Sequence, residues 1–168
     1  LNNAVGSGSL MANTTGSNNA ALGNDALRFN TTGAGNVAMG RQALFCNTTA
    51  NDNVALGYTA LCVNTTGANN TAVASYSLRA NTTASGNTAV GMGSLNANTT
   101  GAVNTAVGLL ALNANTTGSY NAALGREALK VSTTGFEQVA LGNGALIKNT
   151  TGACNIAIGS NAGGNITT

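Results

Sequence analysis

The feature that most constrains this chain is a repeat of 17 residues that runs through all 168 residues without an insertion or deletion. The triplet Asn-Thr-Thr recurs at intervals of 17 residues or a multiple of 17. Ten copies begin at residues 2, 19, 36, 53, 70, 87, 104, 121, 138 and 155, and both ends of the chain fall inside a copy. A globular domain tolerates loops of varying length, whereas a stack in which each unit rests on the last does not. We therefore expect residues 1–168 to form one tandem-repeat unit, a segment of a longer fibre.

The consensus of the copies is Asn-x-Ala-Φ-Gly-x-x-Ala-Leu-x-x-Asn-Thr-Thr-Gly-x-x, where Φ is aliphatic. Position 3 is Ala and positions 13 and 14 are Thr in all ten copies, while position 9 is Leu in nine. A period of 17 residues is too short for paired helices, which need about 33 residues or more per repeat. Gly at positions 5 and 15 also disfavours helix. The repeat therefore predicts an all-β fold.

Positions 2 to 4 of each copy alternate large and small side chains around the Ala, which is typical of a short strand. The two Gly columns predict corners, because Gly adopts positive φ freely. We predict a parallel β-solenoid (β-roll) of ten coils, each with about two short strands, at a rise of about 4.8 Å per coil. We expect the side chains of positions 4 and 9 to fill the interior. The predicted core ladder at position 9 consists of Leu27, Leu44, Leu61, Leu78, Leu95, Leu112, Leu129 and Leu146.

Charge indicates which positions face outward. Only 6% of the residues are charged, and all of them fall at positions 6, 7, 10, 11 or 17. We therefore expect positions 6, 7, 10 and 17 to be exposed. The net charge is +2, with no basic cluster interleaved with aromatic residues, so nucleic acid is not an expected partner. No apolar run is long enough to insert into a membrane.

Association with copies of the same chain is expected for two reasons. The large aliphatic side chains of one chain provide less burial free energy than the ordering of its backbone costs. Ala at position 3 permits another chain to approach closely on the second face of the strand. In addition, neither end of the chain carries a polar capping segment, so we expect coaxial stacking or further sequence to cover the end coils.

The unit Asn-Thr-Ala-Val-Gly at residues 104–108, together with Ala-Leu and Asn-Thr-Thr-Gly, resembles the 17-residue repeat of tail-fibre-like proteins of phages and bacteria. The resemblance covers the whole chain. More loosely, the unit is similar to the head repeats of trimeric autotransporter adhesins, which carry Ser-Val-Ala-Ile-Gly at a shorter period. Either resemblance implies an extracellular, trimeric, left-handed β-roll on a cell-surface filament or virion fibre, with cell-surface glycans as candidate ligands. The self-cleaving chaperone domain in which tail-fibre proteins often end has no counterpart here.

The reactive residues do not predict an enzyme. The chain has no His, so it lacks the usual general base, nucleophile partner and metal ligand, and we expect no catalytic residue, metal or cofactor. The acidic residues are Asp25, Asp52, Glu127 and Glu137. Only Glu127 and Glu137 share a coil, and Arg126 and Lys130 beside Glu127 predict a solvated ion pair.

The three cysteines occupy three different columns, with Cys46 at position 11, Cys62 at position 10 and Cys154 at position 17. No spacing among them resembles a zinc site. Cys46 and Cys62 fall on adjacent coils but one column apart, so we expect their side chains to point to opposite faces. All three are interpreted as substitutions at outward positions.

The Asn-Thr-Thr column has two readings. It is an acceptor sequence for N-glycosylation, and a row of glycans would coat one edge of the rod if position 12 faces outward. Alternatively, Asn caps a turn and the Thr side chains fill ladders. The candidate acceptors are Asn13, Asn30, Asn47, Asn64, Asn69, Asn81, Asn98, Asn115, Asn149 and Asn165.

Together these patterns predict a structural repeat module of an extracellular fibre, which gives length, stiffness and display of a binding surface. Two alternatives stay open. The first is a glycan-decorated extracellular filament subunit. The second is an ice-binding β-solenoid, although adjacent Thr residues point to opposite faces, so only one Thr per coil could join a given array.

Overall fold

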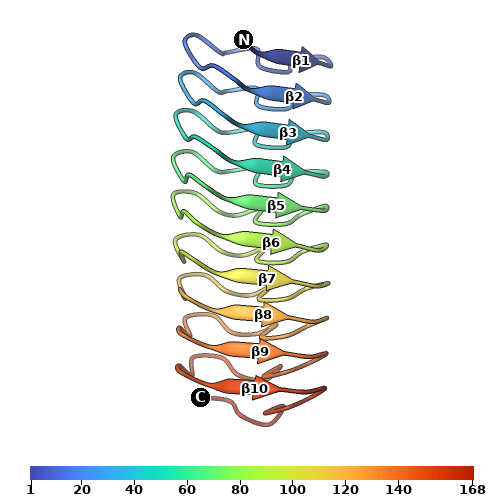
Figure 1. Cartoon of the computed structure of the whole chain (residues 1–168), viewed down its shortest axis with the longest axis vertical. Coiled ribbons are helices and arrows are strands. Elements are labelled where there is room, and N and C mark those ends of the chain that lie inside the picture. Colours follow the sequence, from blue (N-terminus) through green and yellow to red (C-terminus); the bar gives the residue numbers. More distant parts are fainter.

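The computed structural model of the chain covers residues 1–168 and confirms the parallel β-solenoid with one coil per repeat (Figure 1). Ten strands form a single parallel sheet in sequence order, and no helix is present that could span a membrane. The two termini lie at opposite ends of the rod. The strands are β1 (Asn3–Val5), β2 (Ala20–Leu22), β3 (Val37–Met39), β4 (Val54–Leu56), β5 (Thr71–Val73), β6 (Thr88–Val90), β7 (Thr105–Val107), β8 (Ala122–Leu124), β9 (Val139–Leu141) and β10 (Ile156–Ile158).

The register of the sheet turns every column of the repeat into a ladder. In each pair of neighbouring strands a residue faces the equivalent residue of the next coil, as Ala72 of β5 faces Ala89 of β6. Because no copy has an insertion, this register holds from β1 to β10. Identical side chains therefore stack directly on one another along the rod.

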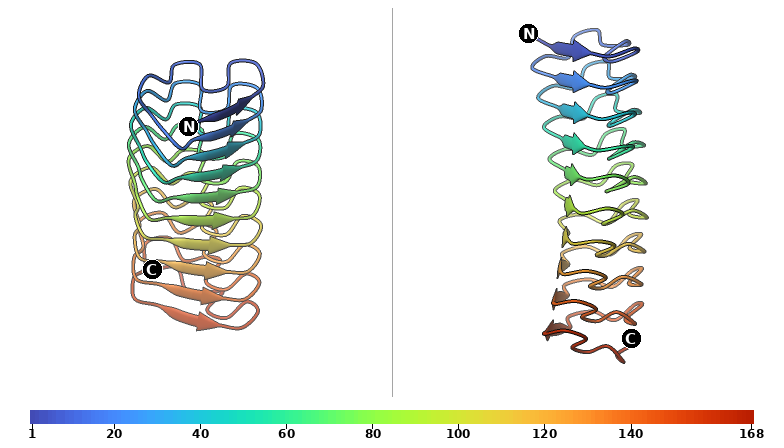
Figure 2. Two further views of the ribbon diagram at one scale, coloured as in Figure 1. Left: turned by 45° about the horizontal axis from the view of Figure 1, so that its top comes forward. Right: turned by 90° about the vertical axis from the view of Figure 1, so that its right-hand side faces the viewer.

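Each coil contains one strand, and the expectation of a second strand was wrong. The return segment, positions 6 to 11, forms turns on the side of the rod opposite the strands (Figure 2). Within it, Tyr76 and Leu78 have φ values of 62° and 48°, which lie far from extended backbone. These turns still bond to both neighbouring coils, since the N–H of Tyr76 donates to the carbonyl of Tyr58 at 3.0 Å and that of Leu78 to Ser94 at 3.0 Å.

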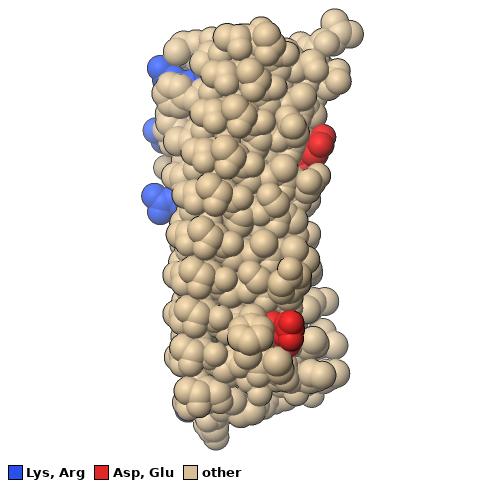
Figure 3. Space-filling view, turned by 90° about the vertical axis from the view of Figure 1, so that its left-hand side faces the viewer, with Lys and Arg blue, Asp and Glu red and all other residues tan.

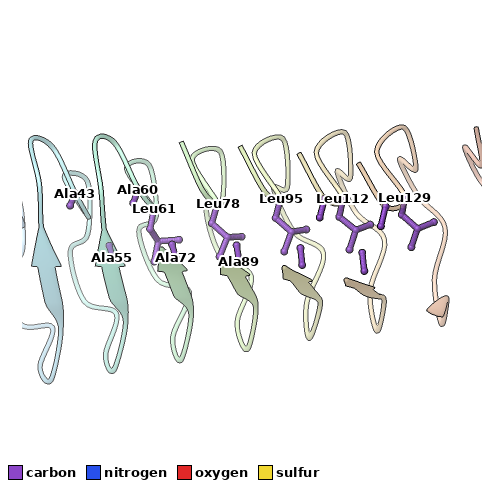
Figure 4. Close-up of a cluster of buried hydrophobic side chains, with 14 of the residues drawn as sticks. Ala43, Ala55, Ala60, Leu61, Ala72, Leu78, Ala89, Leu95, Leu112 and Leu129 are labelled. Carbon is purple, nitrogen blue, oxygen red and sulfur yellow. The ribbon is translucent and has the colours of Figure 1, made fainter. Parts of the chain in front are cut away.

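The interior is a thin layer in which the Ala column of the sheet packs against the Leu column of the turns (Figure 4). The predicted Leu ladder is confirmed, since all eight side chains from Leu27 to Leu146 are 0% exposed. The Ala at position 3 is buried from β2 to β10, while Ala or Ser fills position 8. Small side chains are needed there because the Leu ladder already occupies the space between the two sides of the coil.

The prediction that position 4 fills the interior was wrong. Its side chains point outward, and Met39, Leu124 and Leu141 are 43%, 40% and 44% exposed. The alternation of the strand was assigned correctly, but to the opposite face. Since Ala at position 3 lies inside, positions 2 and 4 must both lie outside.

Two columns of Asn line the rest of the interior and satisfy backbone groups that the short strands leave unpaired. At position 1, the Oδ1 atom of Asn36 accepts from the backbone N–H of Asn53 at 3.0 Å. At position 12, the Nδ2 atom of Asn64 donates to the Oδ1 atom of Asn47 at 3.1 Å. Asn53 and Asn64 also both donate to the carbonyl of Gly67, at 3.0 and 2.9 Å. The Asn ladders therefore hold the corners of adjacent coils together.

The Gly column at position 5 is required by the backbone. Gly108 has φ of 135°, and a Cβ atom there would lie 2.5 Å from the carbonyl oxygen of Gly125 in the next coil. Both the conformation and the close approach disfavour a side chain, which accounts for Gly at nine of the ten copies, with Ala74 as the exception.

Candidate functional surfaces

The largest candidate surface is the outward face of the sheet, formed by the side chains of positions 2 and 4. It carries no charged residue over ten strands. Position 2 contributes mostly Val, Thr and Ala, and position 4 is aliphatic in every copy. The position 4 column consists of Val5, Leu22, Met39, Leu56, Val73, Val90, Val107, Leu124, Leu141 and Ile158, all of them exposed or half-buried. We call this surface the sheet face.

Charged side chains lie away from a broad uncharged surface. Figure 3 shows one side of the rod with a continuous uncharged area, basic side chains along one edge and acidic side chains towards the other. The expectation that charged columns face outward holds fully for positions 6 and 17, which are mostly exposed. For positions 7 and 10 the expectation was wrong, because most of these side chains are half-buried or buried against the neighbouring coils.

The acidic residues do not converge on a catalytic centre. Glu127 accepts from Lys130 at 3.2 Å and from Arg126 at 3.4 Å, which confirms the predicted ion pair. The hydrogen bond from Lys130 is the main reason that the pKa of Glu127 lies below its usual value. Asp25 is bound to Arg28 at 2.7 Å instead. No group of three metal-binding side chains occurs anywhere on the rod.

The acceptor Asn residues of position 12 face inward, so they do not form the row of glycans that outward placement would give. Seven of them are fully buried: Asn30, Asn47, Asn64, Asn81, Asn98, Asn115 and Asn149. Asn13, in the first coil, is half-buried. A side chain inside the folded coil has no room for a sugar. Only Asn69 and Asn165, which stand outside this column, are exposed.

The Thr pair has one inward function and one outward function. At position 13 the hydroxyl donates to the backbone carbonyl of the next coil, as Thr65 does to Thr82 at 3.1 Å. At position 14 the side chain is exposed in all ten coils. The rod therefore presents a single row of Thr, which agrees with the expectation that adjacent Thr residues point to opposite faces.

A ridge formed by positions 10 and 11 was not predicted from the sequence. Here the side chain at position 11 of one coil meets the side chain at position 10 of the next. Phe29 and Phe45 stand in this relation, with ring centres 4.9 Å apart in an edge-to-face arrangement. The only pocket, of about 340 Å³, lies on the same ridge. It is lined by Val63, Arg79, Ala80, Asn96 and Ala97, which offer one cation and no nucleophile or acid.

Cys46 and Cys62 occupy the same two columns as the phenylalanine pair. The backbone N–H of Cys46 donates to the carbonyl of Cys62 at 2.9 Å, and both residues are half-buried. Because the rings of Phe29 and Phe45 meet in these two columns, the expectation that side chains here point to opposite faces was wrong. The third cysteine, Cys154, is exposed and its thiol donates to the carboxylate of Glu137 at 3.6 Å.

These observations define the class of the protein, a tandem-repeat parallel β-solenoid whose exposed sheet face is apolar and uncharged. Comparison with protein-family models, with curated proteins and with solved structures finds no match to the chain. Its function must therefore be argued from the surfaces described above.

Proposed function

We propose that the chain is a structural shaft segment of an extracellular fibre, of the tail-fibre or adhesin-stalk kind, rather than an enzyme. Its role is to supply length and stiffness and to display a binding surface, with cell-surface glycans as candidate ligands of the whole fibre. Each added coil would lengthen such a shaft by about 4.8 Å without altering the coils already present. Stiffness is supported by 111 backbone hydrogen bonds, most of which connect one coil to the next.

The observation that carries this proposal is the aliphatic column at position 4. It faces outward, yet no copy replaces it by a polar residue. Exposed columns such as positions 6 and 17 accept Arg, Asp, Asn and Ser. Soluble monomers rarely expose a continuous apolar surface of this length, and such surfaces are typical of interaction sites. We therefore infer that the sheet face is covered in the assembled fibre.

The partner that best fits the sheet face is another copy of the chain. The aliphatic side chains repeat along the rod at the coil spacing, about 4.8 Å, so a partner can match them over the full length only if it has the same spacing. A second copy has this spacing, and it brings no charge to an interface that has none. Packing of the two faces would bury aliphatic side chains that the coil itself leaves exposed. Three copies in a left-handed β-roll, as the resemblance implies, are the proposed assembly.

Coaxial stacking is a second contact that we propose between copies. The ten strands of the chain are joined in one sheet in sequence order. A further coil of the same repeat can add to the edge of such a sheet, because edge strands pair readily with another strand. Copies stacked in this way would continue the sheet and extend the fibre.

Paired variants of similar exposure test the lateral interface. Val107 and Leu141, on the sheet face, are 37% and 44% exposed, whereas Val63 and Val131, on the ridge, are 37% and 36% exposed. Each pair is changed to Asp in the full chain, folding is checked by circular dichroism, and mass in solution is measured by sedimentation equilibrium. We expect the wild type and the ridge variant to be oligomers and the sheet-face variant to be a monomer. A monomeric wild type, or equal masses for the two variants, would overturn the proposal.

A further inference from the structure

The cysteine pair on the ridge consists of two residues that the repeat itself does not require. Cys46 lies at position 11 of the third coil and Cys62 at position 10 of the fourth, and no other coil has a thiol in either column. Neither thiol takes part in the Asn, Thr or Leu ladders that hold the coils together. The pair is therefore an addition to the repeat rather than a part of it.

The backbone brings the two residues within the distance of a disulfide. The N–H of Cys46 and the carbonyl oxygen of Cys62 are separated by 2.9 Å between nitrogen and oxygen. With standard bond lengths, this hydrogen bond limits the distance between the two Cα atoms to at most about 6.8 Å. Disulfides usually join Cα atoms about 4.4–6.8 Å apart. No backbone movement between coils is needed to reach this range.

The side chains of these columns also leave the rod on the same side. Phe29 and Phe45 hold the equivalent places one coil earlier, and their rings touch with centres 4.9 Å apart. Their backbones are joined by the same hydrogen bond, from the N–H of Phe29 to the carbonyl of Phe45 at 3.2 Å. Two aromatic rings in van der Waals contact show that two much smaller thiols can face each other there.

The thiols are partly accessible, and the charge of one affects the pKa of the other. Both are half-buried on an outward ridge, so a small reagent can reach them. Burial raises the pKa of Cys46, and burial together with the neighbouring Cys46 raises the pKa of Cys62, an effect that Arg79 partly opposes. A raised pKa leaves little thiolate at neutral pH, so reaction should be slow there and faster in mild alkali.

We propose that Cys46 and Cys62 form a redox modification site, which a low-molecular-weight disulfide converts into a covalent link between the third and fourth coils. One protein thiolate attacks the small disulfide and releases the first small thiol. The second protein thiolate then attacks the mixed disulfide and releases the second small thiol. Overall, the two cysteine sulfurs are oxidised, the small disulfide is reduced, and two protons and two electrons pass from the protein to the reagent.

The link would fasten two coils near the N-terminal half of the rod and limit their separation. A disulfide that closes a loop of this length constrains the unfolded chain, and we expect the midpoint of thermal unfolding to rise by about 5–10 °C. The site thus lets the stability of the rod respond to oxidation. This proposal does not depend on the role of the chain in a fibre.

The test uses the full chain with Cys154→Ser, which leaves only the pair, treated with oxidised glutathione under native conditions in mild alkali. Intact mass distinguishes the loss of two hydrogen atoms, expected for the link, from the gain of glutathionyl groups. Cleavage before Asp52 places Cys46 and Cys62 on different fragments, which stay together until a reductant is added if the link has formed.

A matched control keeps the outcome clear. The Cys46→Ser chain retains Cys62 and Cys154, which are five coils apart, and should take up glutathione without any internal link. The proposal is overturned if the native pair takes up two glutathionyl groups and remains unlinked. It is also overturned if the link forms no faster in the folded chain than in denaturant, since the geometry of the rod would then contribute nothing.

Discussion

The interior of the rod contains one place where both Asn ladders are interrupted together. Ser132 replaces Asn at position 12 of the eighth coil, and Gln138 replaces Asn at position 1 of the ninth. Both side chains are 0% exposed, and the Nε2 atom of Gln138 donates to the Oγ atom of Ser132 at 3.2 Å. The longer Gln reaches across the space that the shorter Ser leaves. The two substitutions therefore compensate each other sterically and by hydrogen bonding.

The position 12 ladder has unfilled hydrogen bonds on both sides of this site, and the position 1 ladder has one on its C-terminal side. Oδ1 of Asn115, Oε1 of Gln138 and both amide atoms of Asn149 are buried without a partner. An Asn in place of Ser132 would donate to Asn115 and accept from Asn149, as Asn64 does within the intact ladder. Restoring both Asn residues should therefore regain hydrogen bonds worth about 1 kcal/mol each.

In a double-mutant cycle of Ser132 and Gln138, we expect each single substitution to destabilise the fold and the coupling energy between them to be stabilising. Ser132→Asn alone places an amide where Gln138 already lies, and overpacking should cost about 1–3 kcal/mol. Gln138→Asn alone leaves a void and a hydroxyl of Ser132 without a partner, at about 1–3 kcal/mol. The double variant should be at least as stable as the wild type. The expected coupling energy is thus at least about 2 kcal/mol.

The cycle is measured by urea unfolding followed by circular dichroism. A matched control installs the same Ser and Gln pair in an uninterrupted part of the ladders, by Asn98→Ser and Asn104→Gln. There the loss of stability in the double variant should be smaller than the sum of the losses in the two single variants. If the single effects at residues 132 and 138 add to within about 0.5 kcal/mol, the two side chains do not compensate each other and the reasoning fails.

Three further outcomes follow from the geometry of single coils. Leu78→Ala should lower the free energy of unfolding by about 2–5 kcal/mol, and Val73→Ala by less than about 1 kcal/mol in the monomeric state, since only Leu78 is fully buried. Equal losses in urea titrations would contradict the assignment of the faces. Val103 is a β-branched residue at φ of 57° and is 52% exposed, so Val103→Asn should raise stability by about 1 kcal/mol, and a lower unfolding midpoint would argue against backbone strain there. The pKa of Glu127 is lowered in the folded chain chiefly by the hydrogen bond from Lys130. The ionised carboxylate therefore stabilises the fold above the unfolded carboxyl pKa of about 4.3, and this stabilisation is lost as the pH falls through the lower folded pKa. Glu127→Gln should therefore give a flatter loss of thermal stability in acid, and parallel pH profiles of the two chains would refute this.

The sequence was sufficient to predict the architecture because the repeat has no insertions. A gap-free period fixes one coil per copy, and the alternation around Ala located every strand to within a residue. The Leu ladder and the ion pair of Glu127 with Lys130 were also predictable, since burial and charge leave clear patterns in the columns.

The orientation of the strands was not predicted, because alternation separates two faces without saying which is inside. The answer depends on what the return segment places opposite the sheet, and here it is a Leu ladder that leaves room only for Ala. A usable signal was present in the repeat. Position 3 tolerates no change of size in ten copies, whereas position 4 accepts Val, Leu, Ile and Met. Tolerance of shape is typical of a surface, and strict size is typical of a crowded interior.

The turn conformation of the return segment was not predicted, for a different reason. Leu78 and its equivalents adopt φ values near those of a left-handed turn, a conformation that the residue type does not favour. Burial of a whole Leu side chain, worth about 1.5–3 kcal/mol, exceeds the roughly 1–2 kcal/mol cost of that conformation. Tertiary packing therefore overrides local preference in the nine coils that carry this Leu, and no local sequence rule would have indicated it.

For some columns of the repeat, the folding of a single coil explains why the residue type is kept in every copy, and for others it does not. Ala, Leu, both Asn columns, the two Gly columns and the first Thr are buried or complete hydrogen bonds between coils, so folding of a single chain accounts for them. The aliphatic column of the sheet face has no such internal role, yet it is kept from β1 to β10, including the central strands. An exposed column that accepts no polar residue in ten copies is what the proposed lateral contact between rods would require. A second rod packed side by side would contact this column along the entire rod, whereas a ligand bound at one point would contact only a few coils.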